Sequence, residues 1–319
     1  MEERHDKNCF IEVLKHWFYR QLGVEVPDVF LYIIFGSLNF HYSSRLEDPS
    51  HIFPKVDLIQ PTDETNLEKW LGLKTIWHDP VTSERGWNRL EPLLMKGQNP
   101  IVRVAVHMLP DLEATQTVTF MSINQYLPEE SAVDVFSTFY SGRLSLEKLD
   151  LARREIVSFS LPECQWLELS MTEMPVLDHS YLERIFLAQL QADLAKGYSA
   201  ANFEKMIADL LLVEGLNPLL AKLYIACFGK HMFHPKGPAS VRREMLSVMH
   251  ELQKGGTVSE ETVVRYEVLC QQWDILKMMF AKAGAAPKQM VERLIERVRT
   301  IAALEQEVFD MMRKQVKVG

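Results

Sequence analysis

Apolar residues recur every three or four positions from residue 6 to residue 23, which is the period of an amphipathic helix. The recurring positions are Phe10, Val13, Leu14, Trp17, Phe18 and Leu22. Asp6 suits the N-cap, and Gly23 follows the last apolar position, where helices commonly end. Cys9 then falls in the first turn, where unpaired N–H groups and the helix dipole favour a thiolate. Cys9 is therefore a candidate nucleophile; the alternative is a small core residue.

Before residue 100 the pattern predicts short helices and little sheet. Helices are expected after Pro27, at 64–73 and at 86–94, with a short alternating strand at 38–42. The polar segment 46–58 contains Pro49 and Pro54, so we expect an exposed loop there.

The period then changes to that of a sheet. Residues 101–109 are β-branched and continuous enough for a buried strand. Residues 118–126 and 132–140 are strand candidates separated by a short turn, which predicts an antiparallel hairpin. Helices followed by a small antiparallel sheet are typical of an α+β domain.

From residue 145 onward nearly every segment has a helical apolar stripe. We expect the boundary between Gly142 and Pro175, which divides the chain into an α+β domain at 1–155 and a helical domain at 156–319.

Composition narrows the class of protein. The chain has 319 residues, of which 47% are hydrophobic and 24% charged, as in a globular protein. Its formal net charge of −8 argues against nucleic acid or an anionic membrane as a partner. The charged start has no apolar segment behind it, and the four cysteines lack CxxC spacing, so a reducing cytoplasmic location is expected.

Motif searches leave cysteine chemistry as the open option. The chain has no GxxxxGK[ST], GxGxxG or GxSxG motif, so neither a nucleotide nor another cofactor is expected. His231 and His234 are three apart near a predicted helix end, but without an obvious third ligand we expect no metal. A nucleophilic cysteine on a first helix requires a histidine base from a later strand and a carboxylate or amide that orients it.

Four stretches of the first 155 residues carry a resemblance to a known family. They are NCFIEVLKHW, IIFGSLNFHY, WNRLEPLLMKGQNPIVRVAVHMLP and FMSINQYLPEESAVDVFSTFYSGRLSLEKLDLAR. They resemble the butirosin-pathway acyltransferase (BtrH-like) family and the related aryl-transfer proteins of petrobactin-type siderophore biosynthesis. The resemblance implies a papain-like fold that takes an acyl group from a carrier-protein thioester and passes it to an amine.

The resemblance also implies a degraded catalytic triad. Cys9 takes the place of the nucleophile, whereas Thr119 falls where the family has histidine and Ser137 where it has aspartate. Hydroxyl groups are too weakly basic to take a proton from a thiol at neutral pH. Three interpretations stay open: another base, with His107 preferred to His16; a Cys9 that the helix start ionises unaided; or a non-catalytic protein.

The sequence therefore supports two functional hypotheses. The first is an acyltransferase or condensation-type protein of antibiotic or siderophore biosynthesis, with an acyl or peptidyl carrier protein domain and a small amine as partners. The second is a catalytically degenerate member of the same fold that serves as a binding or scaffold subunit. A homodimer is one oligomeric state that the sequence leaves open.

Overall fold

The computed structural model describes residues 8–35, 41–43, 55–57, 64–80, 82–159, 161–171, 173–196, 200–233 and 237–316. They form two units, and each unit contains two separate stretches of the chain. Unit 1 comprises Met1–Pro27 and Glu64–Pro175, and unit 2 comprises Asp28–Asp63 and Val176–Gly319.

Unit 1 is built on an antiparallel sheet of six described strands in the order β3-β8-β4-β5-β6-β7. The strands are β3 (Leu73–His78), β4 (Ile101–Ala105), β5 (Val118–Leu127), β6 (Ala132–Phe136), β7 (Ser141–Ser145) and β8 (Trp166–Met171). Its helices are α1 (Cys9–Leu22), α3 (Glu64–Leu71), α4 (Ser83–Met95) and α5 (Leu146–Arg154). Its described residues also form the short 3₁₀ turns η2 (Val106–Met108), η3 (Pro128–Glu130) and η4 (Glu155–Phe159).

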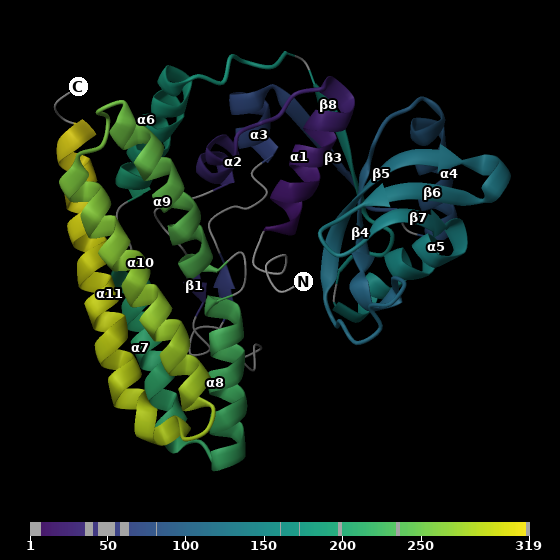
Figure 1. The fold of residues 1–319 in the computed structure, drawn as a ribbon. Coiled ribbons are helices and arrows are strands. Elements are labelled where there is room, and N and C mark those ends of the chain that lie inside the picture. Colours follow the sequence, from purple (N-terminus) through teal and green to yellow (C-terminus); the bar gives the residue numbers. More distant parts are fainter. Residues whose placement is uncertain are drawn as a thin grey trace. The chain divides into compact units, whose positions relative to one another are not determined.

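Strand alternation divides the side chains of this sheet between two faces. Val102, Val104, Met121 and Ile123 pack with α4 and α5 in one apolar core. Residues between these positions in sequence therefore point to the opposite face, where α1 packs against β5 (Figure 1). The sheet thus separates the layer that contains this apolar core from the layer that contains Cys9.

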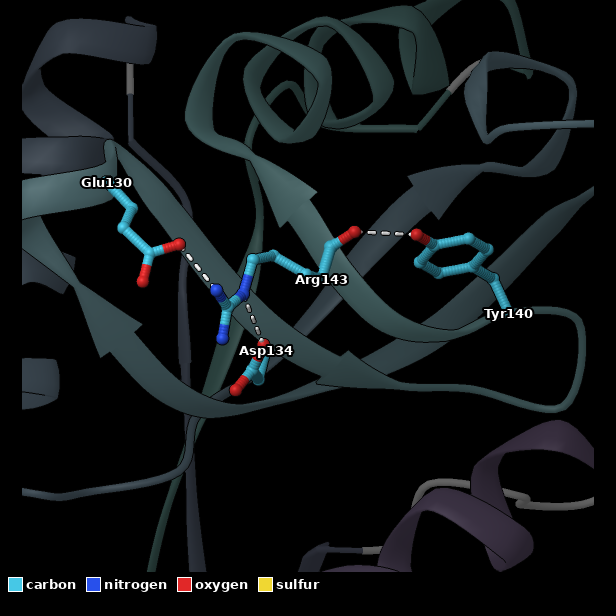
Figure 2. A network of polar contacts seen from close by, with 4 residues as sticks. All are labelled: Glu130, Asp134, Tyr140 and Arg143. Carbon is cyan, nitrogen blue, oxygen red and sulfur yellow. Dashed lines mark hydrogen bonds and ion pairs between the residues drawn. The ribbon is translucent and has the colours of Figure 1, made fainter.

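The hairpin of β6 and β7 forms one edge of the sheet and carries a surface ion-pair network. Arg143 Nε donates to Asp134 at 3.2 Å, and the same guanidinium pairs with Glu130 (Figure 2). The Tyr140 hydroxyl donates to the Arg143 carbonyl at 2.6 Å. Charged side chains on an edge strand hinder pairing with another chain, so we assign this network a structural role.

Unit 2 is mainly helical. Its helices are α2 (Asp28–Phe35), α6 (His179–Lys196), α7 (Ala200–Gly215), α8 (Pro218–Met232), α9 (Pro238–Lys254), α10 (Glu260–Ala283) and α11 (Pro287–Val316). A two-stranded ladder joins β1 (His41–Ser43) to β2 (Lys55–Asp57). Helices α7, α8, α10 and α11 lie side by side as a bundle (Figure 1).

A buried charged network joins α9 to two helices of this bundle, α10 and α11. Arg242 on α9 donates from two nitrogens to Glu305 on α11, at 2.9 and 3.1 Å. Trp273 Nε1 on α10 donates to the same carboxylate at 3.0 Å. Arg242 and Glu305 are 1% and 4% exposed, so each buried charge has an opposite charge as its partner.

The α+β class and the helical character of the C-terminal part are confirmed. Sequence patterning missed β3, β7 and β8. Nearly every described segment after residue 145 is helical, as expected; β8 is the exception, and it pairs with β3 and β4. The expected loop at 46–58 contains β2, and the other residues of that range lie outside the described residues.

The two units also differ from the expected division at 1–155 and 156–319. Residues up to Pro175 belong with the sheet because β8 lies between β3 and β4. Asp28–Asp63 belongs with the helices because α2 packs against α6 and α9. Chain order alone does not predict such an exchange of segments.

Candidate functional site

Cys9 is the first residue of α1, and its side chain is half-buried. The cap is Asn8: its side-chain oxygen accepts the N–H of Phe10 at 3.1 Å, and its carbonyl accepts the N–H of Glu12 at 3.2 Å. The expected cap, Asp6, lies outside the described residues. The helix ends at Gly23 as expected, where a φ of 65° suits glycine.

Phe10 anchors the start of α1 to the sheet. Its ring centroid lies 4.8 Å from that of Phe120 on β5. Phe120 is paired with Arg103 in the ladder between β4 and β5. The first turn of α1 is therefore held next to the row of the sheet that carries Arg103.

Arg103 lies on β4 beside Phe120, next to the first turn of α1, and its electrostatic interaction with Cys9 partly offsets the lowering of the Arg103 pKa by burial. Its guanidinium carbon lies 4.6 Å from the ring centroid of Trp77 and 5.1 Å from that of Phe120. Both distances are within the range of a cation–π interaction. Two aromatic rings from β3 and β5 thus restrain the guanidinium group on the α1 face of the sheet.

Hydrogen bonds restrain the same group from a third direction. Arg103 donates to the side-chain oxygen of Gln165 at 2.5 Å, and the Gln165 amide donates to Asp79 at 2.6 Å. Burial lowers the pKa of Arg103, while the charges of Asp79 and Cys9 oppose this effect. An arginine remains protonated at neutral pH, so the group is a fixed cation that cannot act as a base.

We name this group of side chains the Cys9–Arg103 cluster. Its members are Cys9, Trp77, Asp79, Arg103, Phe120 and Gln165. It comes from α1, β3, β4, β5 and the segments next to β3 and β8, all within unit 1.

His16 faces the sheet two turns further along α1. Its Nε2 lies 3.1 Å from the side-chain oxygen of Asn124, and its ring stacks on Phe136 with centroids 4.0 Å apart. Burial lowers the pKa of His16, and the Asn124 hydrogen bond opposes the effect. Seven residues of α-helix span about 10 Å, so the imidazole is held away from the Cys9 end of the helix.

His107 lies in η2, just after β4. Its Nε2 is 3.8 Å from Glu155, and its ring centroid is 6.0 Å from that of Phe159. Both partners belong to η4, which follows α5 directly, and α5 packs on the apolar face of the sheet. The structure therefore brings His107 together with η4 and not with α1.

Thr119 lies on β5 and is 1% exposed. Its hydroxyl donates to the Phe120 carbonyl at 3.3 Å. Thr119 shares the strand face of Met121, a member of the apolar core, so it lies on the opposite side of the sheet from Phe120. A histidine at Thr119 would consequently point away from α1.

Ser137 lies in the turn between β6 and β7. Its hydroxyl accepts the N–H groups of Phe139 at 3.3 Å and of Tyr140 at 2.9 Å, and it donates to the Tyr140 carbonyl at 3.1 Å. These bonds close the turn, as serine hydroxyls commonly do. The side chain is 4% exposed, and its bonds serve the hairpin.

The other three cysteines have different surroundings from Cys9. Cys164 is fully buried, and burial raises the pKa of its thiol. Burial also raises the pKa of Cys270 to about 12, and its sulfur lies 3.4 Å from the Arg242 carbonyl. Cys227 on α8 is half-buried. Among these thiols, Cys9 combines partial exposure, a helix start and a nearby arginine.

Sequence reasoning missed Arg103, although a signal was present. The stretch IVRVAV places one charged residue in the middle of a strand whose other members are apolar. A charged residue is rarely placed there without a partner or a role. Trp77 and Gln165 had no such signal, because the strands that bring them to Arg103 were not predicted.

Comparison with protein-family models and with curated proteins finds no match to this chain. Within the part of the chain that the structure describes, no three His, Cys, Asp or Glu side chains gather as metal ligands. His234 lies outside the described residues, so the HxxH spacing is not defined by the structure. No described helix is both long and apolar enough to cross a membrane.

Proposed function

We propose that unit 1 is an acyl-transfer domain that accepts an acyl group on Cys9 from a thioester and passes it to an amine. The observation that supports this proposal is the position of Cys9 at the start of α1, half-buried and within the electrostatic reach of Arg103. The family resemblance of the first 155 residues suggests a carrier-protein domain as the natural donor. In this proposal the fold is a papain-like arrangement that has lost its histidine base.

The chemistry requires less assistance than peptide hydrolysis. The Cys9 thiolate attacks the thioester carbonyl, the carbonyl π electrons move to oxygen, and the donor thiolate leaves when the tetrahedral intermediate collapses. The thioester made is as activated as the one consumed. A neutral amine then attacks the acyl-Cys9 carbonyl, the thiolate of Cys9 leaves, and the amine proton passes to water. Backbone N–H groups at the helix start are suited to stabilise the oxyanion.

An acyl-thioester probe tests this proposal on the full chain. We expect incubation with the N-acetylcysteamine thioester of hexanoic acid to add one hexanoyl group, located on Cys9 by peptide mass spectrometry. Cys9→Ala should abolish the adduct, and Cys227→Ala should leave it unchanged. Labelling of Cys227 with no label on Cys9 would contradict the proposal.

A binding or scaffold subunit is the second candidate function. It is favoured by the partners of His16 and His107, because each imidazole contacts groups other than Cys9. This candidate predicts that the chain captures a carrier protein in a pull-down but gains no acyl group from a loaded carrier. Acylated Cys9 that turns over when an amine is added would exclude it.

A further inference from the structure

Arg103 differs from Arg242 and Arg143 in the kind of group that it contacts. Arg242 pairs with a carboxylate, and Arg143 pairs with two. Arg103 instead donates to the neutral amide of Gln165 and lies against two aromatic rings. The carboxylate of Asp79 is one residue further away, behind that amide. The guanidinium is therefore held firmly in place while its charge lacks a direct carboxylate partner in this network.

We propose that Arg103 binds an anionic carboxylate on the acyl donor, so that dicarboxylic half-thioesters are the preferred substrates at Cys9. The acyl part of this inference rests on the proposed function, whereas the anion-binding part rests on the geometry around Arg103. A guanidinium presents several donors in a planar fork that matches a carboxylate. Trp77 and Phe120 would pack against the apolar carbons between the carboxylate and the thioester.

Two further observations favour an anionic ligand at this position. Burial lowers the pKa of Arg103, so a second negative charge would offset the cost of keeping the cation out of water. Gln165 is 8% exposed and is fixed by Asp79, so the guanidinium does not need to be reoriented when a ligand arrives. Binding to a preorganised group loses little conformational entropy.

A pair of alkylating reagents tests anion binding without any acyl chemistry. Iodoacetate and iodoacetamide both transfer a two-carbon group to a thiolate and release iodide, and they differ in one negative charge. We expect the ratio of their rates at Cys9 to exceed the ratio at glutathione by about 10-fold or more, because a charge-assisted hydrogen bond to the guanidinium stabilises the bound anion. The half-buried Cys227 serves as an internal reference.

Arginine variants locate the effect. Arg103→Gln should return the ratio to that of glutathione, and Arg103→Lys should retain part of it because the charge remains while the fork is lost. Arg143→Gln is the matched control and should behave as the wild type. A wild-type ratio equal to that of glutathione overturns the inference even if Arg103→Gln does not fold.

A second pair of probes separates the two proposals. The mono-N-acetylcysteamine thioester of adipic acid is compared with its methyl ester, which has the same chain without the charge. We expect faster acylation of Cys9 by the acid, again by about 10-fold. Equal acylation by both, with no iodoacetate preference, would reject the carboxylate site and leave the acyl-transfer proposal standing. An iodoacetate preference with no acylation would reject the acyl-transfer proposal and leave the carboxylate site standing.

Discussion

Arg103 in unit 1 and Arg242 in unit 2 are two arginines beside a tryptophan, with opposite surroundings. Arg242 is 1% exposed and donates two hydrogen bonds to the carboxylate of Glu305. Trp273 donates a further hydrogen bond to the same carboxylate. Arg103 is half-buried, contacts the faces of Trp77 and Phe120, and donates to an amide. The charge of Arg242 is thus neutralised by a carboxylate of the protein. In our proposal the charge of Arg103 is neutralised by the carboxylate of a ligand.

This difference indicates which arginine contributes to stability and which contributes to function. A closed buried ion pair leaves no group for a ligand, and its value is the correct alignment of α9, α10 and α11. A restrained cation next to a half-buried thiol can act on a ligand. We therefore expect changes at Glu305 to affect folding and changes at Arg103 to affect chemistry.

The largest effect on stability is expected from Glu305→Leu. The substitution leaves Arg242 buried without its carboxylate, which should lower the free energy of unfolding by about 3–5 kcal/mol. Urea unfolding of the full chain, followed by circular dichroism, measures it. Glu307→Leu removes an exposed ion pair with Arg265 and should have a much smaller effect, because solvent screens such pairs. Equal costs for the two variants would show that the buried network has no special role.

A second carboxyl group in unit 2, that of Glu244, makes the stability of this unit depend on pH. Burial, followed by the charge of Asp28, raises the pKa of Glu244 from 4.5 to about 8. The folded state therefore holds a proton that the unfolded state loses, and the resulting stability is full below pH 4.5 and lost as pH rises to about 8.

Glu244→Gln should flatten this dependence. Between pH 5 and pH 7 the wild type should lose about 2 kcal/mol of unfolding free energy that the variant keeps. The reason is that each pH unit in this window is worth up to about 1.4 kcal/mol. Urea midpoints measured at several pH values check the prediction. Parallel pH profiles for variant and wild type would contradict it.

Ser137→Ala tests the assignment of this hydroxyl to the hairpin. Two backbone N–H groups lose their acceptor, so unit 1 should be destabilised by about 1–2 kcal/mol. The alkylation rate of Cys9 should stay within about 2-fold of wild type, since Ser137 serves the turn. A large fall in Cys9 reactivity with unchanged stability would instead support the triad position that the family resemblance implies.

The smallest effect on stability is expected from Arg103→Gln. Arg103 and Trp77 are half-buried and Phe120 is 5% exposed, and cation–π contacts in such a setting contribute about 1 kcal/mol. The same urea measurement as for Glu305→Leu ranks the two sites directly. If Arg103→Gln costs as much as Glu305→Leu, Arg103 is a structural residue and the contrast between the two units disappears.

Local patterning predicted the elements with a strong period of their own. The helix that carries Cys9 and ends at Gly23 was predicted, as were the hairpin strands β5 and β6 and the long helices of unit 2. Strands β3 and β8 were missed because their stability comes from pairing with strands that are distant in the chain. Strand β7 pairs with the neighbouring β6, but its residues, SGRLS, include a single apolar side chain and give no strand pattern of their own.

The sequence by itself determined that Cys9 would lie in the first turn of an amphipathic helix, because capping and periodicity act over a few residues. Only the tertiary structure decided what lies beside that cysteine. Residues 77, 103, 120 and 165 meet through strand pairings that join distant parts of the chain. The face of β5 on which Thr119 lies was likewise set by strand register, since a shift of one residue exchanges the two faces of a sheet.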